Sequence, residues 1–522
     1  MSEKPGIVKN AGSSVVQIMI SGVALVVLYR YLLETIGVAQ LGVWSLVLAV
    51  SSMIQVANFG LTGSIVKNIA DYDGRGDKDS MTRAIQTAAI TVALLTLALI
   101  ACAYPGATYY LSFAMEGQSY HDALEVLPLA LVAFWILMVT SIYQSGLYGC
   151  QLIVQRNGIL MAESISHLVL CVLLAPRYGL LGLAYARVAQ NVITLLASMA
   201  FLKKHLPELP LLPYQWDKKL FKEMVGYAAS FQVISLLVML SDPVTKALLS
   251  RFGSVSMVGY YEMANKLVQL FRSVIVNANQ VLVPAFAHLK QFQLQKLTEL
   301  YLTSSHLVVY LALPGFGLLA ICAPLVSELL IGRYEPVFVC STMLLCAGWL
   351  ANTLAVPAYY ACLGTGEMRI NIVSHAGMTV LNILLGLTFG QLIGGLGVVM
   401  SWTIALGFGG ILLNVLYYRK HSIPIASLIS EPDRMLTSYC GAGLAVAYIV
   451  WLMLPGVWGL LLPILNFPAT WEPFLTSGMM IVTYVAIISF PMWNHSMRKD
   501  LQRWVTGAFG RRKLLASSHR VM

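Results

Sequence analysis

Charge is scarce in this sequence. Of its 522 residues only 11% are Asp, Glu, Lys or Arg, whereas 58% are hydrophobic. A soluble protein usually has about a quarter of its residues charged. The composition therefore excludes a set of soluble domains, a disordered chain and a secreted disulfide scaffold. It indicates a membrane protein that crosses the bilayer many times.

Reactive motifs and long polar loops are also missing. The eight cysteines include no CxxC pair and lie mostly in apolar stretches, which is typical of buried thiols. The first apolar run begins after Lys9 and has no small-residue cleavage pattern behind it, so we predict no cleaved signal peptide. The longest outer loops, near 114–123 and 456–473, are too short for a soluble catalytic domain. We expect no enzymatic activity, no metal and no organic cofactor, and a function that lies among the helices.

Long hydrophobic runs are what the sequence does have. A helix needs about 20 apolar residues to cross a bilayer, and fourteen runs reach this length. We predict an all-α polytopic membrane protein with spans near 10–33, 38–66, 84–113, 124–147, 157–175, 179–202, 223–250, 255–285, 300–330, 336–362, 370–389, 393–418, 435–455 and 474–493.

The distribution of Lys and Arg predicts the orientation in the membrane. With the N-terminus in the cytoplasm, 25 of these residues fall in cytoplasmic segments and only Arg177, Arg251 and Arg333 in outer ones. Basic residues accumulate in the cytoplasmic loops of membrane proteins. We therefore predict that both termini are cytoplasmic, and that the net charge of +10 reflects orientation rather than nucleic-acid binding.

The sequence repeats itself weakly at a spacing of 215 or 216 residues. Arg30 stands seven residues before Gly37, and Lys246 stands seven residues before Gly253. Three further pairs continue the register: Gly149 with Gly364, Gly179 with Gly394, and Gly182 with Gly397. Six spans separate the copies, so both copies have the same orientation, as in transporters built from parallel repeats.

The repeat predicts two six-helix lobes related by a pseudo-two-fold axis along the membrane normal, with substrate bound between them. The predicted boundaries are an N-lobe at 1–202, a cytoplasmic interfacial linker at 203–222, a C-lobe at 223–420, two added helices at 421–493 and a basic cytoplasmic tail at 494–522. The Pro, Trp, Leu and Lys content of the linker is typical of a strap along the inner membrane surface.

Two stretches resemble a known family. The run GVAQLGVWSLVLAVSSMIQVANFGLTGSIVKNIADYDGRGD (37–77) resembles the second helix and first cytoplasmic loop of the Wzx-type polysaccharide flippases. The run DPVTKALLSRFGSVSMVGYYEMANKLVQLF (242–271), with Pro284 beyond it, is similar to their seventh and eighth helices. These flippases belong to the multidrug/oligosaccharidyl-lipid/polysaccharide exporter superfamily. The similarity consists of loose motifs and extends over roughly residues 5–420.

The resemblance implies a flippase of the bacterial inner (plasma) membrane. Its substrate would be undecaprenyl-pyrophosphate-linked oligosaccharide, moved to the periplasmic leaflet by alternating access for O-antigen, exopolysaccharide or capsular polysaccharide synthesis. The implied partners are this lipid-linked oligosaccharide, membrane lipids, a polysaccharide polymerase and chain-length proteins, with no nucleic acid. A cation-coupled drug exporter and a peptidoglycan-precursor flippase of the same superfamily remain alternatives.

Five cations lie inside the predicted spans, where a charge is costly and indicates a functional site by default. The flippase hypothesis assigns them to the pyrophosphate, because guanidinium groups match phosphate oxygens. The predicted substrate-binding cations are Arg272, Arg187, Arg30, Lys246 and Lys266. Arg272 is the strongest candidate, since it lies in mid-span with no acid one helical turn away. Interhelical packing contacts and side chains that reach back to the membrane surface are the alternative roles.

Acidic residues one helical turn from these cations form candidate pairs. The pairs are Arg30–Glu34, Asp242–Lys246 and Glu262–Lys266, and Glu163 has the same spacing to His167. Such pairing would make the acids structural. The other hypothesis is that Asp242, Glu163 or Glu262 binds H⁺ or Na⁺ during transport. Four tyrosines are candidates to stack on sugar rings: Tyr260, Tyr261, Tyr359 and Tyr360.

Overall fold

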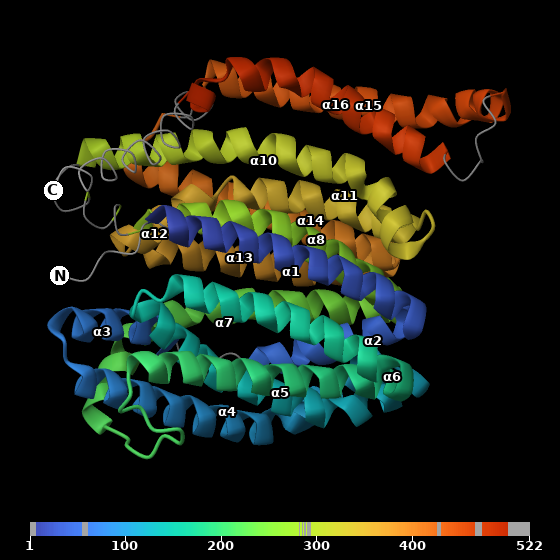
Figure 1. The fold of residues 1–522 in the computed structure, drawn as a ribbon. Helices are drawn as coiled ribbons and strands as arrows, with labels where there is room; N and C mark the ends of the chain where they lie inside the picture. The colour runs from blue at the N-terminus through green and yellow to red at the C-terminus, as the bar shows by residue number, and fades with distance from the viewer. Residues whose placement is uncertain are drawn as a thin grey trace, which may run out of the picture. The chain divides into compact units, whose positions relative to one another are not determined.

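The computed structural model describes residues 7–54, 61–280, 282–283, 286, 289, 294–424, 430–464 and 472–499. Helices make up nearly all of these residues, and no strand occurs within them. The helices are α1 (Ile7–Thr35), α2 (Gly37–Ser52), α3 (Leu61–Arg75), α4 (Lys78–Ala114), α5 (Gln118–Gly149), α6 (Ile153–His205), α7 (Lys218–Phe252), α8 (Val255–Gln280), α10 (Leu294–Ile331), α11 (Pro336–Thr353), α12 (Val356–Thr365), α13 (Met368–Ile393), α14 (Gly395–His421), α15 (Glu431–Ile464) and α16 (Glu472–Asn494) (Figure 1). The predicted all-α fold is confirmed.

All fourteen predicted spans coincide with helix in the described residues. The span 38–66 comprises α2 and α3, with 55–60 outside the description, and the span 336–362 comprises α11 and α12. The spans 157–175 and 179–202 are the two halves of α6, whose backbone leaves the helical conformation at Gly179 (φ 55°, ψ −128°). Pro284, Lys290 and most of the predicted basic tail lie outside the described residues.

Ten helical segments in the described part are long and apolar enough to cross a membrane. One of these is α6, which contains two predicted spans. α8 coincides with a predicted span but is not among the ten. Together, α7 and α8 carry five of the eight candidate site residues. Polar groups in a membrane helix are turned away from lipid, so we expect these two helices to contribute to a site.

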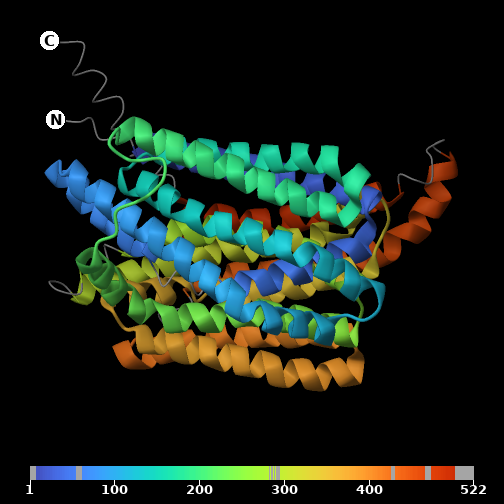
Figure 2. The same ribbon diagram turned by 90° about the horizontal axis from the view of Figure 1, so that it is seen from below.

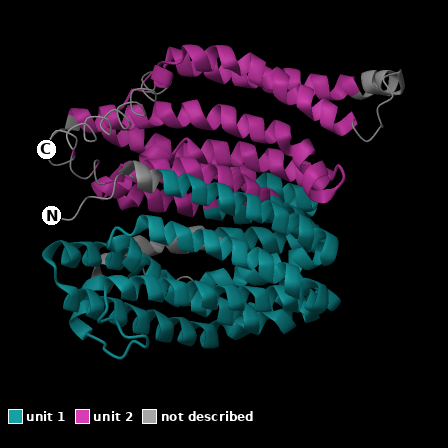
Figure 3. Ribbon diagram, viewed as in Figure 1, with its two compact units in different colours: residues 1–263, 379–401 teal, residues 264–378, 402–522 magenta. Residues whose placement is uncertain are grey.

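The chain forms two compact units (Figure 3). Unit 1 comprises residues 1–263 and 379–401, and unit 2 comprises residues 264–378 and 402–522. The boundaries fall within α8, α13 and α14 rather than at the predicted linker. The lobe boundaries drawn from the sequence repeat therefore stay a prediction.

Each unit is held by helices packed along their lengths. In unit 1, α5 packs against α4 and α6, and α1 packs against α6 (Figures 1 and 2). In unit 2, α15 and α16 pack on each other and on α10. The buried side chains there include Tyr310, Leu436 and Tyr484. Small residues allow the closest approaches: a Cβ on Gly149 of α5 would lie 2.8 Å from the Ile69 Cβ of α3.

Backbone conformation repeats at the same spacing as the sequence. Positive φ values recur 215 residues apart in the pairs Gly117/Gly332, Gln151/Gly366 and Gly179/Gly394. The packing after the last pair also repeats. A Cβ on Gly182 would lie 2.5 Å from the carbonyl oxygen of Leu174, and one on Gly397 would lie 2.1 Å from that of Phe389. These matches support the internal repeat.

One predicted pair matches in position only. Gly37 is the first residue of α2, and Gly253 lies between α7 and α8, so each stands at the junction of the first two helices of its copy. Their φ angles differ, however, at 80° and −118°. The two copies therefore share the order of helices while their first turns have diverged.

Candidate functional site

Lys246 is enclosed by two carboxylates. Its side chain is only 6% exposed, and its Nζ lies 2.8 Å from Asp242 Oδ2, one turn earlier in α7, as the sequence spacing predicts. Nζ also lies 2.8 Å from Glu262 Oε2 in α8. We refer to these three residues as the Lys246 cluster. When all three groups are ionised, the cluster has one negative charge in excess.

A second charged group lies along α6. Arg187 Nη1 donates to Gln190 Oε1 at 2.9 Å. Glu163, in the other half of the same helix, is close enough for its charge to interact with that of Arg187, and its side chain hydrogen-bonds to Gln190. The break at Gly179 allows the two halves of α6 to face each other. This pairing joins residues 24 positions apart, so helical spacing could not reveal it.

Tyr29 of α1 lies near both groups. It lies close enough to both Glu262 and Arg187 to interact with their charges. Unit 1 thus brings together five of the predicted site residues, contributed by α6, α7 and α8: Glu163, Arg187, Asp242, Lys246 and Glu262. His167, predicted to pair with Glu163, has its Nε2 3.8 Å from the Sγ of Cys171.

Arg30 and Lys266 lie in more open surroundings. Arg30 Nε lies 3.3 Å from Glu34 Oε1, as predicted, and its side chain is 50% exposed. Its counterpart in the repeat, Lys246, is buried, so equivalent positions have different environments. Lys266 is exposed on α8.

Arg272 occupies a separate site in unit 2. Its Nη2 donates to Asn352 Oδ1 of α11 at 3.1 Å, and its Cζ lies 4.4 Å from the ring centre of Trp349. The Nε atom is buried and has no hydrogen-bond partner. Among the described residues no carboxylate forms an ion pair with this guanidinium. A buried donor without an acceptor is energetically unfavourable, which makes this atom a candidate ligand contact.

Aromatic side chains surround Arg272. Tyr359 and Tyr360 of α12 lie close enough to interact with it electrostatically, and their rings are 5.3 Å apart at 80°. The ring of His375 in α13 lies 5.8 Å from that of Tyr359, almost perpendicular to it. We call these residues, with Trp349 and Asn352, the Arg272 site. It combines one guanidinium with flat apolar rings, which suits a ligand that carries both an anion and sugar rings.

The sequence did not indicate Trp349 or Asn352. Both lie in α11, about 80 residues after Arg272, and nothing in their local spacing distinguishes them from other residues of an apolar helix. The indole Nε1 of Trp349 donates to Asn265 Oδ1 at 3.3 Å, which fixes the ring that faces Arg272. The available signal was a tryptophan within an apolar span, because a buried indole N–H needs a hydrogen-bond partner nearby.

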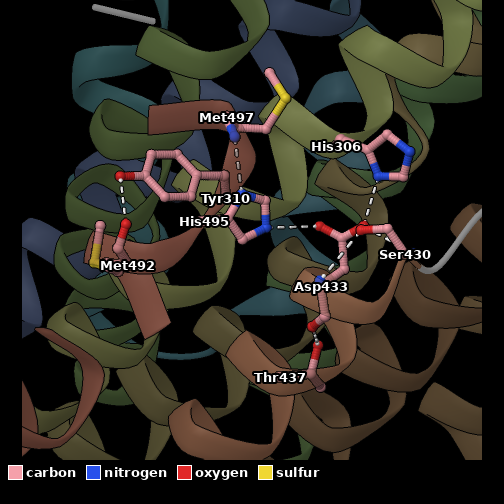
Figure 4. Close-up of polar contacts among 8 residues, drawn as sticks. All are labelled: His306, Tyr310, Ser430, Asp433, Thr437, Met492, His495 and Met497. Carbon is pink, nitrogen blue, oxygen red and sulfur yellow. Dashed lines mark hydrogen bonds and ion pairs between the residues drawn. The ribbon is translucent and has the colours of Figure 1, made fainter. Parts of the chain in front are cut away.

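Asp433 forms a third polar cluster, in unit 2 (Figure 4). It lies in the first turn of α15, where its Oδ2 bonds to His306 Nδ1 of α10 and its Oδ1 lies 3.1 Å from His495 Nε2, just after α16. Ser430 N–H donates to Asp433 Oδ2 at 3.1 Å, and Asp433 N–H donates to Ser430 Oγ at 3.3 Å. This reciprocal pair is a capping box. The spacing of Ser430 and Asp433 was a signal for it that our sequence interpretation did not use.

The protonation of His495 follows from its neighbours. The backbone N–H of Met497 donates to His495 Nδ1 at 3.2 Å, so this nitrogen is an acceptor. The ring hydrogen is therefore assigned to Nε2, which donates to Asp433. Asp433 thus ties three segments of unit 2 together, and its role is structural.

Glu367 joins the loop before α13 to the end of α14. Its Oε2 lies 2.9 Å from His421 Nε2, and its Oε1 lies 3.2 Å from Lys420 Nζ. Partial burial acts to raise the pKa of Glu367, but the hydrogen bonds and charges of His421 and Lys420 outweigh it and hold that pKa below its usual value.

These features define a class of protein. The chain is a multi-pass membrane protein with the fold of the MOP superfamily transporters. It is similar to an inward-facing multidrug resistance MATE family transporter, with a TM-score of 0.67 and 16% identity over 78% of this chain and 98% of that chain. It is also similar to the lipid II flippase MurJ in an inward closed conformation, with a TM-score of 0.69 and 12% identity over 95% and 100%.

A third similar structure is a MOP superfamily transporter from Pyrococcus furiosus whose binding pocket has reverse polarity. Its TM-score is 0.58, with 15% identity over 79% of this chain and 96% of that chain. At such low identities the similarity concerns the fold alone. No curated protein matches the sequence.

The family follows from the sequence itself. Residues 7–290 match the model of the family described as polysaccharide biosynthesis protein. This match covers more than half of the chain, and the chain belongs to that family. The resemblance inferred from the runs 37–77 and 242–271 is confirmed.

Proposed function

We propose that the protein is a flippase for undecaprenyl-pyrophosphate-linked oligosaccharide. In this proposal it moves the substrate by alternating access from the cytoplasmic to the periplasmic leaflet of a bacterial inner membrane, with both termini cytoplasmic. The observation that carries the proposal is the Arg272 site, where a guanidinium with a buried, unpartnered Nε is surrounded by aromatic rings.

The Arg272 site offers separate contacts for the two parts of such a headgroup. Arg272 Nη2 already donates to Asn352, and the ring of Trp349 packs against the guanidinium. The Nε–H has no acceptor and can donate to a phosphate oxygen. A charge-assisted hydrogen bond of this kind is shorter and stronger than a neutral one. Tyr359 and Tyr360 then provide ring faces against which the first sugars can pack. The lipid chain stays in the bilayer and no covalent step is needed.

The Lys246 cluster is the proposed coupling site. Its single excess negative charge can be neutralised by H⁺ or Na⁺ on a carboxylate of Asp242 or Glu262. Glu163, near Arg187, is the second candidate carboxylate. Binding and release of the cation would change the charge between α7 and α8, and this supplies the bias that a transport cycle requires.

A drug exporter is the second candidate function. The excess negative charge of the Lys246 cluster favours it, since a cationic substrate needs an acidic site. Arg272 opposes it, because the guanidinium would repel a cation. A peptidoglycan-precursor flippase would also use a pyrophosphate site, and the similarity of fold to MurJ does not distinguish it. Assays with different lipid-linked substrates separate these possibilities. A polysaccharide polymerase and chain-length proteins are the proposed partners.

The test is complementation of surface polysaccharide synthesis, with membrane abundance measured in parallel. Arg272→Ala should lower transport about 30-fold or more, because loss of a buried charged partner costs about 2–5 kcal/mol. Arg272→Lys should keep part of the activity, since it retains the charge and loses the planar fork. Arg369→Ala, which removes an exposed arginine in the same unit, is the matched control. Normal transport by Arg272→Ala at normal abundance would exclude this site.

A further inference from the structure

The segment between α6 and α7 has an extended backbone that lies against α4. Residues 206–217 contain no helix, and α7 begins at Lys218. Figure 1 shows this segment in green near the beginning of α4. We refer to residues 206–217 as the strap. Both the strap and α4 belong to unit 1.

Polar side chains of α4 fix the backbone of the strap. Gln86 Oε1 accepts hydrogen bonds from the backbone N–H groups of Tyr214 and Gln215 at 3.0 and 3.1 Å. Thr87 Oγ1 accepts another from the N–H of Asp217 at 3.2 Å. Gln86 and Thr87 are themselves buried. Backbone donors near a membrane need such partners because lipid provides none.

The second half of the strap turns large apolar side chains outward, whereas Leu206 and Leu209 in its first half are buried. Leu212 is 82% exposed and Tyr214 is 71% exposed, and Leu211 is exposed beside them. Trp216 is also exposed, but its Nε1 donates to Thr91 Oγ1 of α4 at 3.0 Å, so its ring has a fixed orientation. Exposed apolar groups on a rigid backbone form a surface that is ready to bind without further ordering.

The anchoring residues place this surface at the membrane interface. Thr91 lies eight residues beyond Arg83, the last charged residue at the start of α4. At 1.5 Å per residue the separation is about 12 Å. Trp216 therefore lies where the charged end of α4 gives way to its apolar span. Trp and Tyr are enriched at this depth in membrane proteins.

Lysines follow the aromatic residues directly. Lys218, Lys219 and Lys222 are exposed on the first turns of α7. Two acids adjoin these lysines. Asp217 Oδ1 accepts the backbone N–H groups of Lys219 and Leu220 at 2.7 and 3.2 Å, and Glu223 is exposed beside Lys222. Among the described residues neither acid forms an ion pair with one of the three lysines, so their ammonium groups can meet an anion outside the protein. Aromatic anchors beside lysines match the apolar and anionic parts of an acidic lipid.

We propose that the strap and the first turns of α7 form a binding surface for anionic phospholipids in the leaflet that they face. Leu211, Leu212, Tyr214 and Trp216 pack among the acyl chains near the headgroups, and Lys218, Lys219 and Lys222 bind the lipid phosphates. This surface is distinct from the Arg272 site and does not depend on the transported substrate. The positive-inside count predicts that it faces the cytoplasmic leaflet.

The experiment uses the full-length protein in phosphatidylcholine bilayers that contain an equal fraction of either brominated phosphatidylglycerol or brominated phosphatidylcholine. Bromine quenches nearby tryptophans, and the signal of Trp216 is obtained by subtracting that of Trp216→Phe. We expect Trp216 to be quenched more by the anionic lipid, with a local enrichment of about fivefold for each lysine that contacts it. Lys218→Gln with Lys219→Gln should shrink the difference between the two lipids to the contribution of Lys222 alone.

The matched control is Arg419→Gln with Arg434→Gln, which removes two exposed cations from unit 2. It should leave the preference of Trp216 unchanged. Equal quenching by both lipids in the unmodified protein would overturn the anionic specificity. No quenching of Trp216 by either lipid would overturn the whole proposal. Thermal unfolding of each variant, measured alongside, shows that these outcomes come from folded protein.

Discussion

Lys246 Nζ lies 2.8 Å from Glu262 Oε2, and this contact joins α7 to α8 within unit 1. The same nitrogen also lies 2.8 Å from Asp242 Oδ2, so one buried ammonium pairs with carboxylates from two helices. The arrangement makes the lysine more than a candidate substrate ligand. Its removal would leave two carboxylates close together with no cation between them.

Lys246→Met should therefore destabilise the protein strongly. Removing one partner of a buried ion pair costs about 3–5 kcal/mol, because the remaining charge stays uncompensated. Adding Glu262→Gln should restore most of this loss, since the amide has no charge to neutralise. Thermal unfolding in detergent measures both variants. Equal instability of the single and double variants would show that the pair does not determine the effect.

Asp242 gives a test that separates structure from coupling. Asp242→Asn leaves Lys246 paired with Glu262 alone, so the variant should keep near-normal membrane abundance. If Asp242 binds the coupling cation, this variant should be abundant and inactive in the complementation assay. Full transport by Asp242→Asn would remove Asp242 from the coupling role and leave Glu163 and Glu262 as candidates.

The close approach at Gly182 predicts a local steric effect. In Gly182→Ala the new Cβ would lie 2.5 Å from the carbonyl oxygen of Leu174, and overpacking of this kind typically costs about 1–3 kcal/mol. Gly158→Ala in the same helix meets nothing within 4 Å and should be neutral or stabilising, since alanine favours helix. Unfolding temperatures compare the two. A Gly182→Ala protein as stable as Gly158→Ala would contradict the packing.

Local patterns predicted the fold well because membrane helices are long and apolar. Gly179 shows why the repeat could also be found. A backbone position with positive φ is usually occupied by glycine, so this conformational requirement is visible in the sequence. Arg30–Glu34 and Asp242–Lys246 were predictable for a similar reason, since residues four positions apart lie on one helix face.

Contacts between helices were not predictable in this way. Glu262 meets Lys246 and Arg272 lies against Trp349 through the packing of different helices. Glu163 lies near Arg187 because the two halves of α6 fold toward each other at Gly179. A single sequence gives no information on which faces of two helices meet. The embedded charges were thus correctly singled out as unusual, while the partners that determine their roles came only from the structure.

The Asp433 cluster predicts a local effect in unit 2. Asp433→Ala removes the acceptor of His306 and His495 and one half of the capping box. Donors that lose a buried acceptor cost about 1–3 kcal/mol. We expect faster amide hydrogen exchange in α15 and α16. Glu431→Gln, at an exposed acid two residues earlier, is the control and should leave the exchange unchanged. Unchanged exchange in Asp433→Ala would show that packing alone holds these helices.

Glu367 predicts how stability depends on pH. Because its pKa in the folded protein is held below the usual value, its contacts with Lys420 and His421 stabilise the fold fully when the pH is above that usual value, about 4.3. The contribution is lost as the pH falls through the lowered pKa, where the carboxyl group takes up a proton. The difference in unfolding temperature between the unmodified protein and Glu367→Gln should therefore be positive near neutral pH and shrink below about pH 4.

Glu299→Gln is the matched control for the loss of one carboxylate, since Glu299 is exposed in the same unit. Its unfolding temperature should stay close to that of the unmodified protein near neutral pH, where Glu367→Gln is clearly less stable. The double variant Lys420→Gln with Glu367→Gln should be little less stable than Glu367→Gln alone, because either change breaks the same Lys420–Glu367 contact. A stability difference for Glu367→Gln that grows on acidification would reverse the sign argued here and show that the carboxyl group is stabilised in its protonated form.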